Sequence, residues 1–272
     1  MAKHDTPDKH EGLERATLFS SVKALESCNE PFDRAYFGNE FCQRRLPSAS
    51  ELQKATRRVI DDGRGFTLVT PYVTNAGMDL VKARVAELLD MGVPFELVVN
   101  DWGVLGWMRR EHVGVPLLLG RLLSKQKRGP RILSVGSKLP GYARDHVRRS
   151  GVDTPRMVEF LRSRGVERVE FDNLLQGIAR NGGLQASLYY PYGYITTTRL
   201  CLLMEGDQPG KNLRSIGRCH RECLNYDVTL RHEDMPVPLH LKGNTQFFRN
   251  DTLPKDLAAL NITRLVQMPE LP

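Results

Sequence analysis

The chain has 272 residues, of which 40% are hydrophobic and 26% charged, a composition typical of a globular protein with a large core. No run approaches the roughly 18 consecutive apolar residues that a membrane-spanning helix needs. The first residues are polar and are followed by no apolar stretch, unlike a secretory signal. We therefore expect a flexible tail over 1–12, a single domain over 13–272 and a cytoplasmic protein.

Short strand-like segments recur along the chain. The expected strands lie at 16–19, 33–37, 66–70, 95–100, 117–119, 168–171, 186–190 and 262–266. They are near-continuous apolar runs and do not alternate strictly between apolar and polar residues. This pattern suits parallel strands with both faces covered by helices.

Helical periods lie between these strands. Ser48 and Glu51 have the spacing of a capping box and open the first clear helix. A second helical period ends at Gly92, Asp101 is placed to cap a third, and Pro155 begins a fourth. This alternation predicts an α/β fold, namely a TIM-type barrel that is whole or imperfect. A doubly wound sheet is the alternative, but no glycine-rich phosphate-binding turn follows the first strand.

Two stretches interrupt the alternation. Residues 121–154 are a basic insertion, and residues 224–250 have the pattern of a β-hairpin added beside the barrel. The net charge of +7 permits an acidic partner. The insertion is either an RNA-facing patch or a solvated surface. Because Tyr142 is its only aromatic residue, stacking on bases is poorly supported and the solvated surface is favoured.

The chain has five cysteines. In a reducing compartment cysteines rarely form disulfides, and clustered thiols more often serve metal binding or catalysis. Cys42, Cys201, Cys219 and Cys223 come after predicted strands. In a barrel, the segments that follow the strands gather at one face, so the fold brings these four thiols together. Cys28 falls in a helix ahead of the second strand and is therefore not expected to belong to this group of thiols.

Iron–sulfur and zinc sites both remain open from the residues alone. Iron–sulfur clusters take four thiolates whose spacing along the chain need not be tight, and zinc takes the same ligands in tetrahedral geometry. Structural zinc sites usually have two Cys-x-x-Cys pairs, whereas this chain has one looser pair, in GRCHRECLN. His220, His232 and His240 are available to complete a zinc site. Buried thiols without a metal are the third interpretation, although the charged neighbours in GRCHRECLN do not suit a core.

Several segments resemble the collagenase-like, or U-thirty-two, peptidase family. RAYFGNEFCQRR is similar to a Tyr-x-Gly-x-x-x-Cys-x-x-Arg segment of its UbiV-like branch, and ELVVNDWGVL resembles the next strand-to-helix turn. YYPYGYITTTRLC, with the Cys-x-x-x-Cys pair behind it, resembles the cysteine-bearing segment, and KGNTQFF resembles a short strand after it. The resemblance runs in order through roughly residues 15–270.

The resemblance implies a barrel with a 4Fe–4S cluster on Cys42, Cys201, Cys219 and Cys223. It further implies oxygen-independent hydroxylation of a prenylated phenol or quinone precursor of ubiquinone. The chain would act as a subunit of the hydroxylase, in a heterodimer with a sister UbiU-like protein, with prephenate as the oxygen donor. Other members hydroxylate bases of ribosomal or transfer RNA.

The chain departs from the UbiV-like pattern in its Cys201–Cys219 gap and its basic insertion. RNA base hydroxylation and a non-catalytic zinc-binding scaffold are therefore kept as alternatives. No Ser-His-Asp order, paired metal carboxylates or P-loop can be identified, so peptidase activity is not expected.

Polar and aromatic residues near the expected strand ends are candidates for a substrate pocket. They are Asn100, Asp101, Tyr190, Tyr192 and Tyr194. Each has a structural alternative, because an aspartate here also caps a helix and tyrosines in strands usually pack. Glu40 and Arg44 flank Cys42, where a charge would tune a metal centre.

Overall fold

The computed structural model describes residues 12–129, 131–136, 138–211, 217–233 and 235–272. The expected tail, 1–12, lies outside the described residues except for Gly12.

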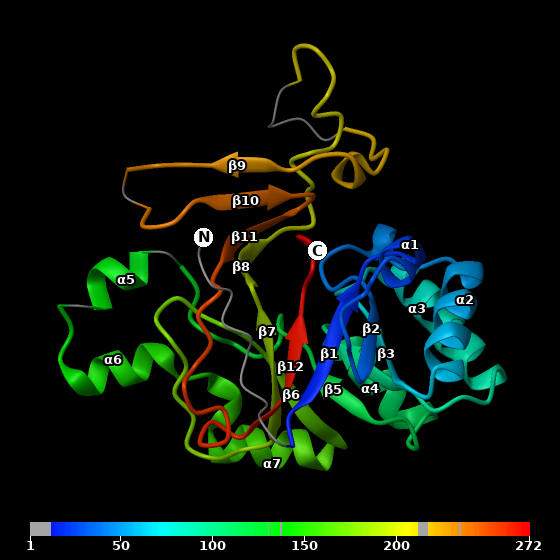
Figure 1. Ribbon diagram of the computed structural model, residues 1–272, viewed down its shortest axis with the longest axis horizontal. Helices are drawn as coiled ribbons and strands as arrows, with labels where there is room; N and C mark the ends of the chain where they lie inside the picture. Colours follow the sequence, from blue (N-terminus) through cyan, green and yellow to red (C-terminus); the bar gives the residue numbers. More distant parts are fainter. Residues whose placement is uncertain (1–11, 130, 137, 212–216, 234) are drawn as a thin grey trace.

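Eight parallel strands close into a barrel (Figure 1). Around the barrel they run in the order β1-β12-β7-β6-β5-β4-β3-β2. The strands are β1 (Glu14–Phe19), β2 (Arg34–Gly38), β3 (Gly65–Val69), β4 (Glu96–Val99), β5 (Leu117–Leu119), β6 (Val166–Asp172), β7 (Gln185–Tyr190) and β12 (Ile262–Gln267). The predicted TIM-type barrel is confirmed.

Helices connect most neighbouring strands of the barrel. They are α1 (Val22–Glu26), α2 (Ala49–Asp61), α3 (Asn75–Asp90), α4 (Trp102–Glu111), α5 (Arg131–Gly136), α6 (Gly141–Arg148) and α7 (Pro155–Ser163). The capping box of α2 is confirmed, because Ser48 Oγ accepts from the Glu51 N–H and the Glu51 carboxylate accepts from the Ser48 N–H. α5, α6 and α7 all lie between β5 and β6, within and just after the basic insertion.

The barrel is imperfect on the side of its last strands. Residues 173–184 join β6 to β7 without a helix. Between β7 and β12 stands an antiparallel sheet in the order β8-β11-β10-β9. Its strands are β8 (Tyr192–Thr197), β9 (Val228–Leu230), β10 (Leu239–Lys242) and β11 (Thr245–Arg249). The predicted hairpin corresponds to β10 and β11, and the sheet covers one end of the barrel (Figure 1).

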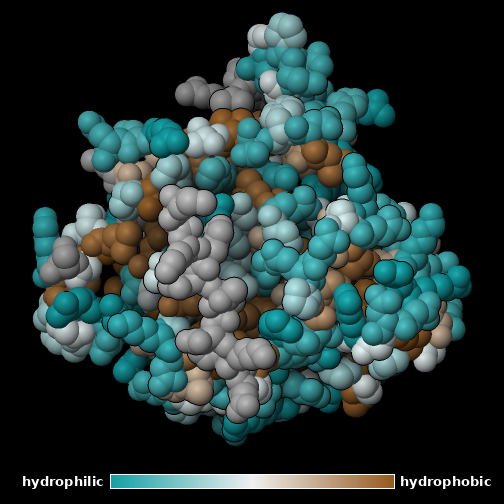
Figure 2. Space-filling model, viewed as in Figure 1, coloured by the Kyte–Doolittle hydropathy of each residue, from teal (hydrophilic) through white to brown (hydrophobic). Residues whose placement is uncertain are grey.

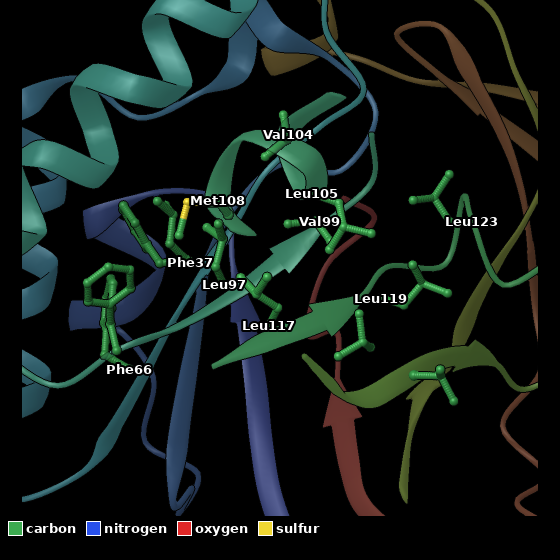
Figure 3. Close-up of a cluster of buried hydrophobic side chains, with 14 of the residues drawn as sticks. Phe37, Phe66, Leu97, Val99, Val104, Leu105, Met108, Leu117, Leu119 and Leu123 are labelled. Carbon is green, nitrogen blue, oxygen red and sulfur yellow. The ribbon is translucent and has the colours of Figure 1, made fainter. Parts of the chain in front are cut away.

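Apolar side chains on alternate positions of the strands build two cores. Outward-facing side chains pack against the helices. Figure 3 shows the part of this core where strands β4 and β5 meet helix α4, formed by Leu97, Val99, Leu117, Val104 and Met108. Inward-facing ones fill the lumen, including Tyr36, Val98 and Tyr189. Burying each such side chain contributes roughly 1.5–3 kcal/mol, so the two cores hold the strand ends in fixed positions.

On the face in Figure 2 hydrophilic side chains prevail, and hydrophobic ones form scattered patches between them. Among the helices of the described residues, none is long and apolar enough to cross a membrane.

Candidate functional site

Four cysteines line one cavity of about 340 Å³ between the barrel and the added sheet. Cys42 follows β2 and Cys201 follows β8. Cys219 precedes the short 3₁₀ turn Glu222–Leu224, and Cys223 lies within this turn. The opposite wall comes from the turn between β10 and β11, around Gly243. Two parts of the chain more than 150 residues apart in sequence thus present their thiols to the same space.

The turn after β2 fixes Cys42. Gly38 has φ of +134°, and a Cβ built on it would lie 2.3 Å from the backbone oxygen of Val69, so glycine is required there. The Asn39 side-chain oxygen then accepts from the backbone N–H groups of Phe41 at 2.9 Å and Cys42 at 2.8 Å. The chain therefore leaves the strand in a closed turn that delivers Cys42 to the cavity.

The segment with the other three cysteines is held by a buried carboxylate. Glu222, 5% exposed, accepts from the backbone N–H groups of Glu205 at 2.6 Å and His220 at 3.1 Å. Asn244 joins this segment to the barrel, because its Nδ2 donates to the carbonyl oxygens of Phe41 at 2.8 Å and Thr198 at 2.6 Å. The two halves of the cavity are thereby tied together by side-chain hydrogen bonds.

The cavity disfavours the ionised forms of Cys42 and Cys201. Burial is the main cause that raises the pKa of Cys42, and it raises the pKa of Cys201 to about 11. The negative charge of neighbouring thiolates raises both further, while backbone N–H groups, those of Arg44 and Leu203 respectively, oppose the shift. Four ionised thiols would repel one another here, so a multiply charged cationic centre is the occupant that suits them.

Cations surround the thiols. The cavity is lined by Arg44, Arg45, Arg199, Arg221 and Lys242. No Asp or Glu side chain is among the described residues that line it. Arg45 Nη1 lies 3.7 Å from Cys223 Sγ, within hydrogen-bonding range of sulfur. These cations would balance the negative charge of a thiolate-bound centre.

The four thiols are the donor set that the cavity offers to a metal centre. In the described part of the chain, no group of three or more His, Cys, Asp and Glu side chains is arranged to hold one metal ion. His220, His232 and His240, the residues considered for zinc, do not line the cavity, and His240 instead lies 3.8 Å from Asp227. Four cysteine thiolates are the usual ligands of an iron–sulfur cluster. The residues present therefore fit such a cluster.

The two candidates at the end of β4 have structural roles. Asn100 is 1% exposed; its Nδ2 donates to the Thr70 carbonyl at 2.9 Å, and its Oδ1 accepts from the Leu122 N–H at 3.1 Å. Asp101 caps α4, with Oδ1 accepting from the Gly103 N–H at 2.7 Å. Neither residue lines the cysteine cavity.

The tyrosine candidates also lie outside the cavity lining. Tyr190 ends β7, whereas Tyr192 and Tyr194 belong to β8 of the added sheet. Tyr194 packs edge-on against Phe41 with ring centroids 5.3 Å apart, so it supports the cavity from behind. Arg44 does line the cavity, as its position beside Cys42 suggested.

Cys28 differs slightly from its predicted position. α1 ends at Glu26, with Ser27 as its C-cap, so Cys28 follows the helix and is not part of it. The helix is only five residues long because the chain turns early toward β2. Cys28 does not line the cavity of the other four cysteines.

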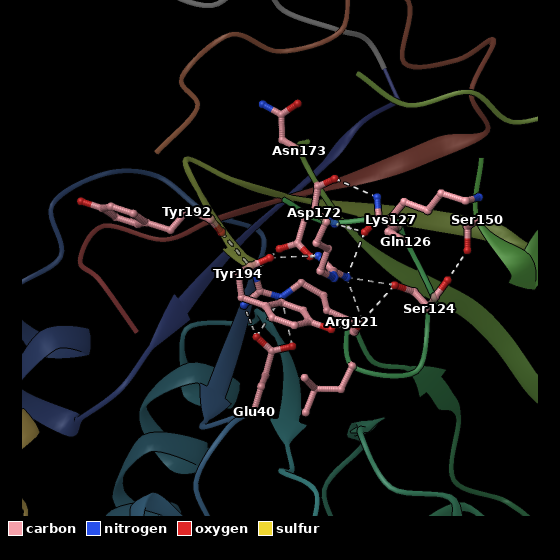
Figure 4. Close-up of polar contacts among 12 residues, drawn as sticks. Glu40, Arg121, Ser124, Gln126, Lys127, Ser150, Asp172, Asn173, Tyr192 and Tyr194 are labelled. Atoms are coloured by element: carbon pink, nitrogen blue, oxygen red, sulfur yellow. Dashed lines mark hydrogen bonds and ion pairs between the residues drawn. The ribbon is translucent and has the colours of Figure 1, made fainter. Parts of the chain in front are cut away.

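Sequence reasoning missed a buried ion-pair network beneath the cavity (Figure 4). Arg121 is fully buried; its Nε lies 3.0 Å from Glu40 Oε2 and its Nη1 lies 2.7 Å from Asp172 Oδ1. Arg128 pairs with the other oxygen of Asp172 and lies over the Tyr194 ring, 3.7 Å from its centroid. Both arginines had been assigned to a solvated or RNA-facing insertion, and that assignment is wrong.

The ends of the barrel strands position the residues of this network. Arg121 comes two residues after β5, Glu40 two residues after β2, and Asp172 ends β6. Parallel strands bring these positions to one mouth of the barrel, where two carboxylates compensate two guanidiniums. Charged residues at or just after the strand ends were a sequence signal for a polar mouth of the barrel, but they did not show which residues pair. Because Glu40 lies two residues before Cys42, the network also anchors the turn that carries this thiol.

Comparisons with known proteins give only remote likenesses. No protein-family model matches the chain, and no curated protein matches it. Among solved structures, the U32 peptidase Mk0906 is 10% identical with a TM-score of 0.47, over 96% of this chain and 94% of that one. A glycoside hydrolase family 18 N-acetylglucosaminidase from Paenibacillus barengoltzii is 10% identical with a TM-score of 0.36, over 94% of each chain. At these TM-scores neither likeness bears on family or activity.

Proposed function

We propose that the chain is an iron–sulfur protein of an oxygen-independent hydroxylation system. The observation that carries the proposal is the meeting of Cys42, Cys201, Cys219 and Cys223 in one cation-lined cavity. Four thiolates are the usual ligands of a 4Fe–4S cluster, which when bound supplies one-electron transfer. In this proposal the thiolates hold the cluster, and the arginines and the lysine around them offset its negative charge.

The substrate part of the proposal is supported by the sequence resemblance to the UbiV-like branch of the collagenase-like peptidase family. The substrate would be a prenylated phenol or quinone precursor of ubiquinone, with prephenate as the oxygen donor. A sister UbiU-like chain would complete the hydroxylase as a heterodimer. The cavity opens between the barrel and the added sheet, so a second reactant has access beside the thiols.

Iron content tests the ligand set. Alanine at each of the four cavity cysteines should lower bound iron and acid-labile sulfide severely in anaerobic preparations, because alanine offers no ligand. Cys28→Ala is the matched control, since Cys28 is a free thiol outside the cavity, and it should keep the iron. Colourless wild-type protein with one zinc per chain would refute the cluster and favour the zinc-binding scaffold.

Quinone analysis tests the substrate. Deleting the gene should stop ubiquinone synthesis only in anaerobic cultures, where an under-hydroxylated prenylated phenol should accumulate. Cys219→Ala should reproduce the deletion, whereas Cys28→Ala should restore synthesis. Lipid extracts from aerobic and anaerobic cultures would be compared by mass spectrometry. Unchanged quinone pools in both cultures would remove the ubiquinone assignment.

RNA base hydroxylation is the second candidate, favoured by the surface of the basic insertion. Lys138, Arg144 and Arg149 are exposed there, and Tyr142 is 82% exposed between them. Exposed cations with an accessible aromatic ring suit contacts with phosphates and bases. A lost hydroxyl on one tRNA or rRNA base in the deletion strain, together with tight tRNA binding at physiological salt, would decide for this alternative.

A further inference from the structure

We propose that Arg45 sets the reduction potential of the metal centre through a hydrogen bond to the sulfur of Cys223. The inference rests on the proposed iron–sulfur function. Arg45 Nη1 lies 3.7 Å from Cys223 Sγ, and the arginine is half-buried in the cavity wall. A guanidinium stays protonated at any physiological pH, so the donor is permanently charged.

The position of Arg45 couples the two halves of the cavity. It ends the short 3₁₀ turn Gln43–Arg45 directly behind Cys42, so its backbone belongs to the barrel side. Its side chain reaches Cys223 on the opposite segment. Behind that sulfur stands Gly243, where an added Cβ would lie 3.7 Å from Sγ. Cys223 Sγ is therefore packed between a backbone turn and a cationic donor.

Two other cations of the cavity donate to backbone carbonyls. Arg199 donates to the Val73 carbonyl at 3.2 Å, and Lys242 donates to the Leu271 carbonyl at 2.9 Å. Arg44 lines the same cavity with an exposed side chain. Of the described cavity cations, Arg45 is the one that has a side-chain hydrogen bond to a cysteine sulfur.

The effect on the potential follows from electrostatics. Reduction adds one electron to the cluster from an external one-electron donor, and the added negative charge spreads onto the ligand sulfurs. A charged N–H donor at 3.7 Å from one sulfur stabilises the reduced state more than the oxidised state. No bond to sulfur breaks, and Arg45 keeps its proton. The hydrogen bond therefore raises the reduction potential, as hydrogen bonds to cluster sulfurs do in general.

A redox titration with dithionite, followed by EPR of the reduced cluster, tests the inference. Arg45→Ala should lower the equilibrium constant for reduction about tenfold, which is ~59 mV for a one-electron couple. Arg44→Ala is the matched control, because it removes the same charge from the same cavity without a bond to sulfur. Its effect on the reduction potential should be clearly smaller than that of Arg45→Ala, since its exposed charge is screened. Arg45→Gln, which keeps an N–H donor without the charge, should fall between wild type and Arg45→Ala.

Two outcomes would overturn the inference. Equal shifts for Arg45→Ala and Arg44→Ala would assign the effect to overall charge, and an unchanged potential in Arg45→Ala would remove the effect altogether. Iron and sulfide are measured first on every preparation. Wild-type protein without them would refute the proposed function itself, whereas full iron content with an unchanged potential would refute only the role of Arg45. If Arg45→Ala binds no iron, the potentials of Arg45→Gln and wild type are compared instead, and equal potentials would refute the role of Arg45.

Discussion

Glu170 is a carboxyl group buried in the lumen of the barrel, on strand β6. Its Oε1 accepts from Ser187 Oγ at 3.0 Å and from the Tyr36 hydroxyl at 3.4 Å, whereas its Oε2 has no hydrogen-bond partner among the described residues. Burial raises the pKa of Glu170 from 4.5 to about 7, and the positive charges of Arg264 and Arg168 only partly oppose this. The side chain is thus folded into a place that favours its neutral form.

The raised pKa makes stability depend on pH. The contribution of the neutral carboxyl is fully present below the unfolded-state pKa of 4.5 and is lost as the pH rises through the folded-state pKa of about 7. A difference of about 2.5 pH units, at ~1.36 kcal/mol each, corresponds to about 3 kcal/mol. Glu170→Gln removes the titration and keeps the shape, so the stability of the variant relative to wild type should rise by about this amount between pH 4.5 and pH 8.

Thermal unfolding followed by circular dichroism from pH 4.5 to 8 measures the effect. For a chain of this size, about 3 kcal/mol corresponds to a relative gain in Tm of roughly 6 °C at the alkaline end. Glu167→Gln, which removes an exposed carboxylate from the same strand, is the control and should leave the profile parallel to wild type. Parallel profiles for Glu170→Gln and wild type would refute the reasoning.

Two further predictions concern the mouth of the barrel. Arg121→Met should lower the free energy of unfolding by roughly 3–5 kcal/mol in urea titrations, because Glu40 loses its buried partner and Asp172 keeps only Arg128. A loss below about 1 kcal/mol would contradict the buried network. Gly38→Ala should lower the free energy of unfolding by roughly 2–3 kcal/mol and also reduce bound iron, because the added Cβ would lie 2.3 Å from the Val69 carbonyl oxygen. Gly63→Ala is the control, because Gly63 has φ of +71° and an added Cβ there would have no atom within 4 Å. It should lower the free energy of unfolding by only roughly 1–2 kcal/mol and leave bound iron unchanged. Equal losses of stability in both variants would show that the contact with Val69 does not matter.

The barrel was predictable because local signals agree with the global fold. Most strands of the barrel contain an apolar run, and the helices between them carry their own start signals, such as the Ser48 capping box and Asp101. Once the barrel was expected, the gathering of cysteines far apart in the sequence followed from its topology. The positions of the sulfurs relative to the surrounding cations could not be predicted in this way, because they depend on the conformations of the turns that carry these side chains.

The added sheet and the buried arginines were not predictable in the same way. The expected strand at 186–190 ends where β7 ends, but no strand was expected over Tyr192–Thr197, which forms β8 of the second sheet just after Pro191. Arg121 and Arg128 were counted with a basic surface because charged residues are rarely buried. Only the tertiary pairing with Asp172 and Glu40 makes their burial tolerable, and such pairing across the barrel has no local signature.

The insertion of the added sheet between β7 and β12 has a consequence for biosynthesis. Cys42 leaves the ribosome early, but the wall formed by the other three thiols follows only after seven strands of the barrel have been made. The barrel itself closes when β12, at Ile262–Gln267, pairs with β1 and β7. The cavity is therefore completed only after β12 has been made, and whatever fills it binds after that strand has joined the barrel.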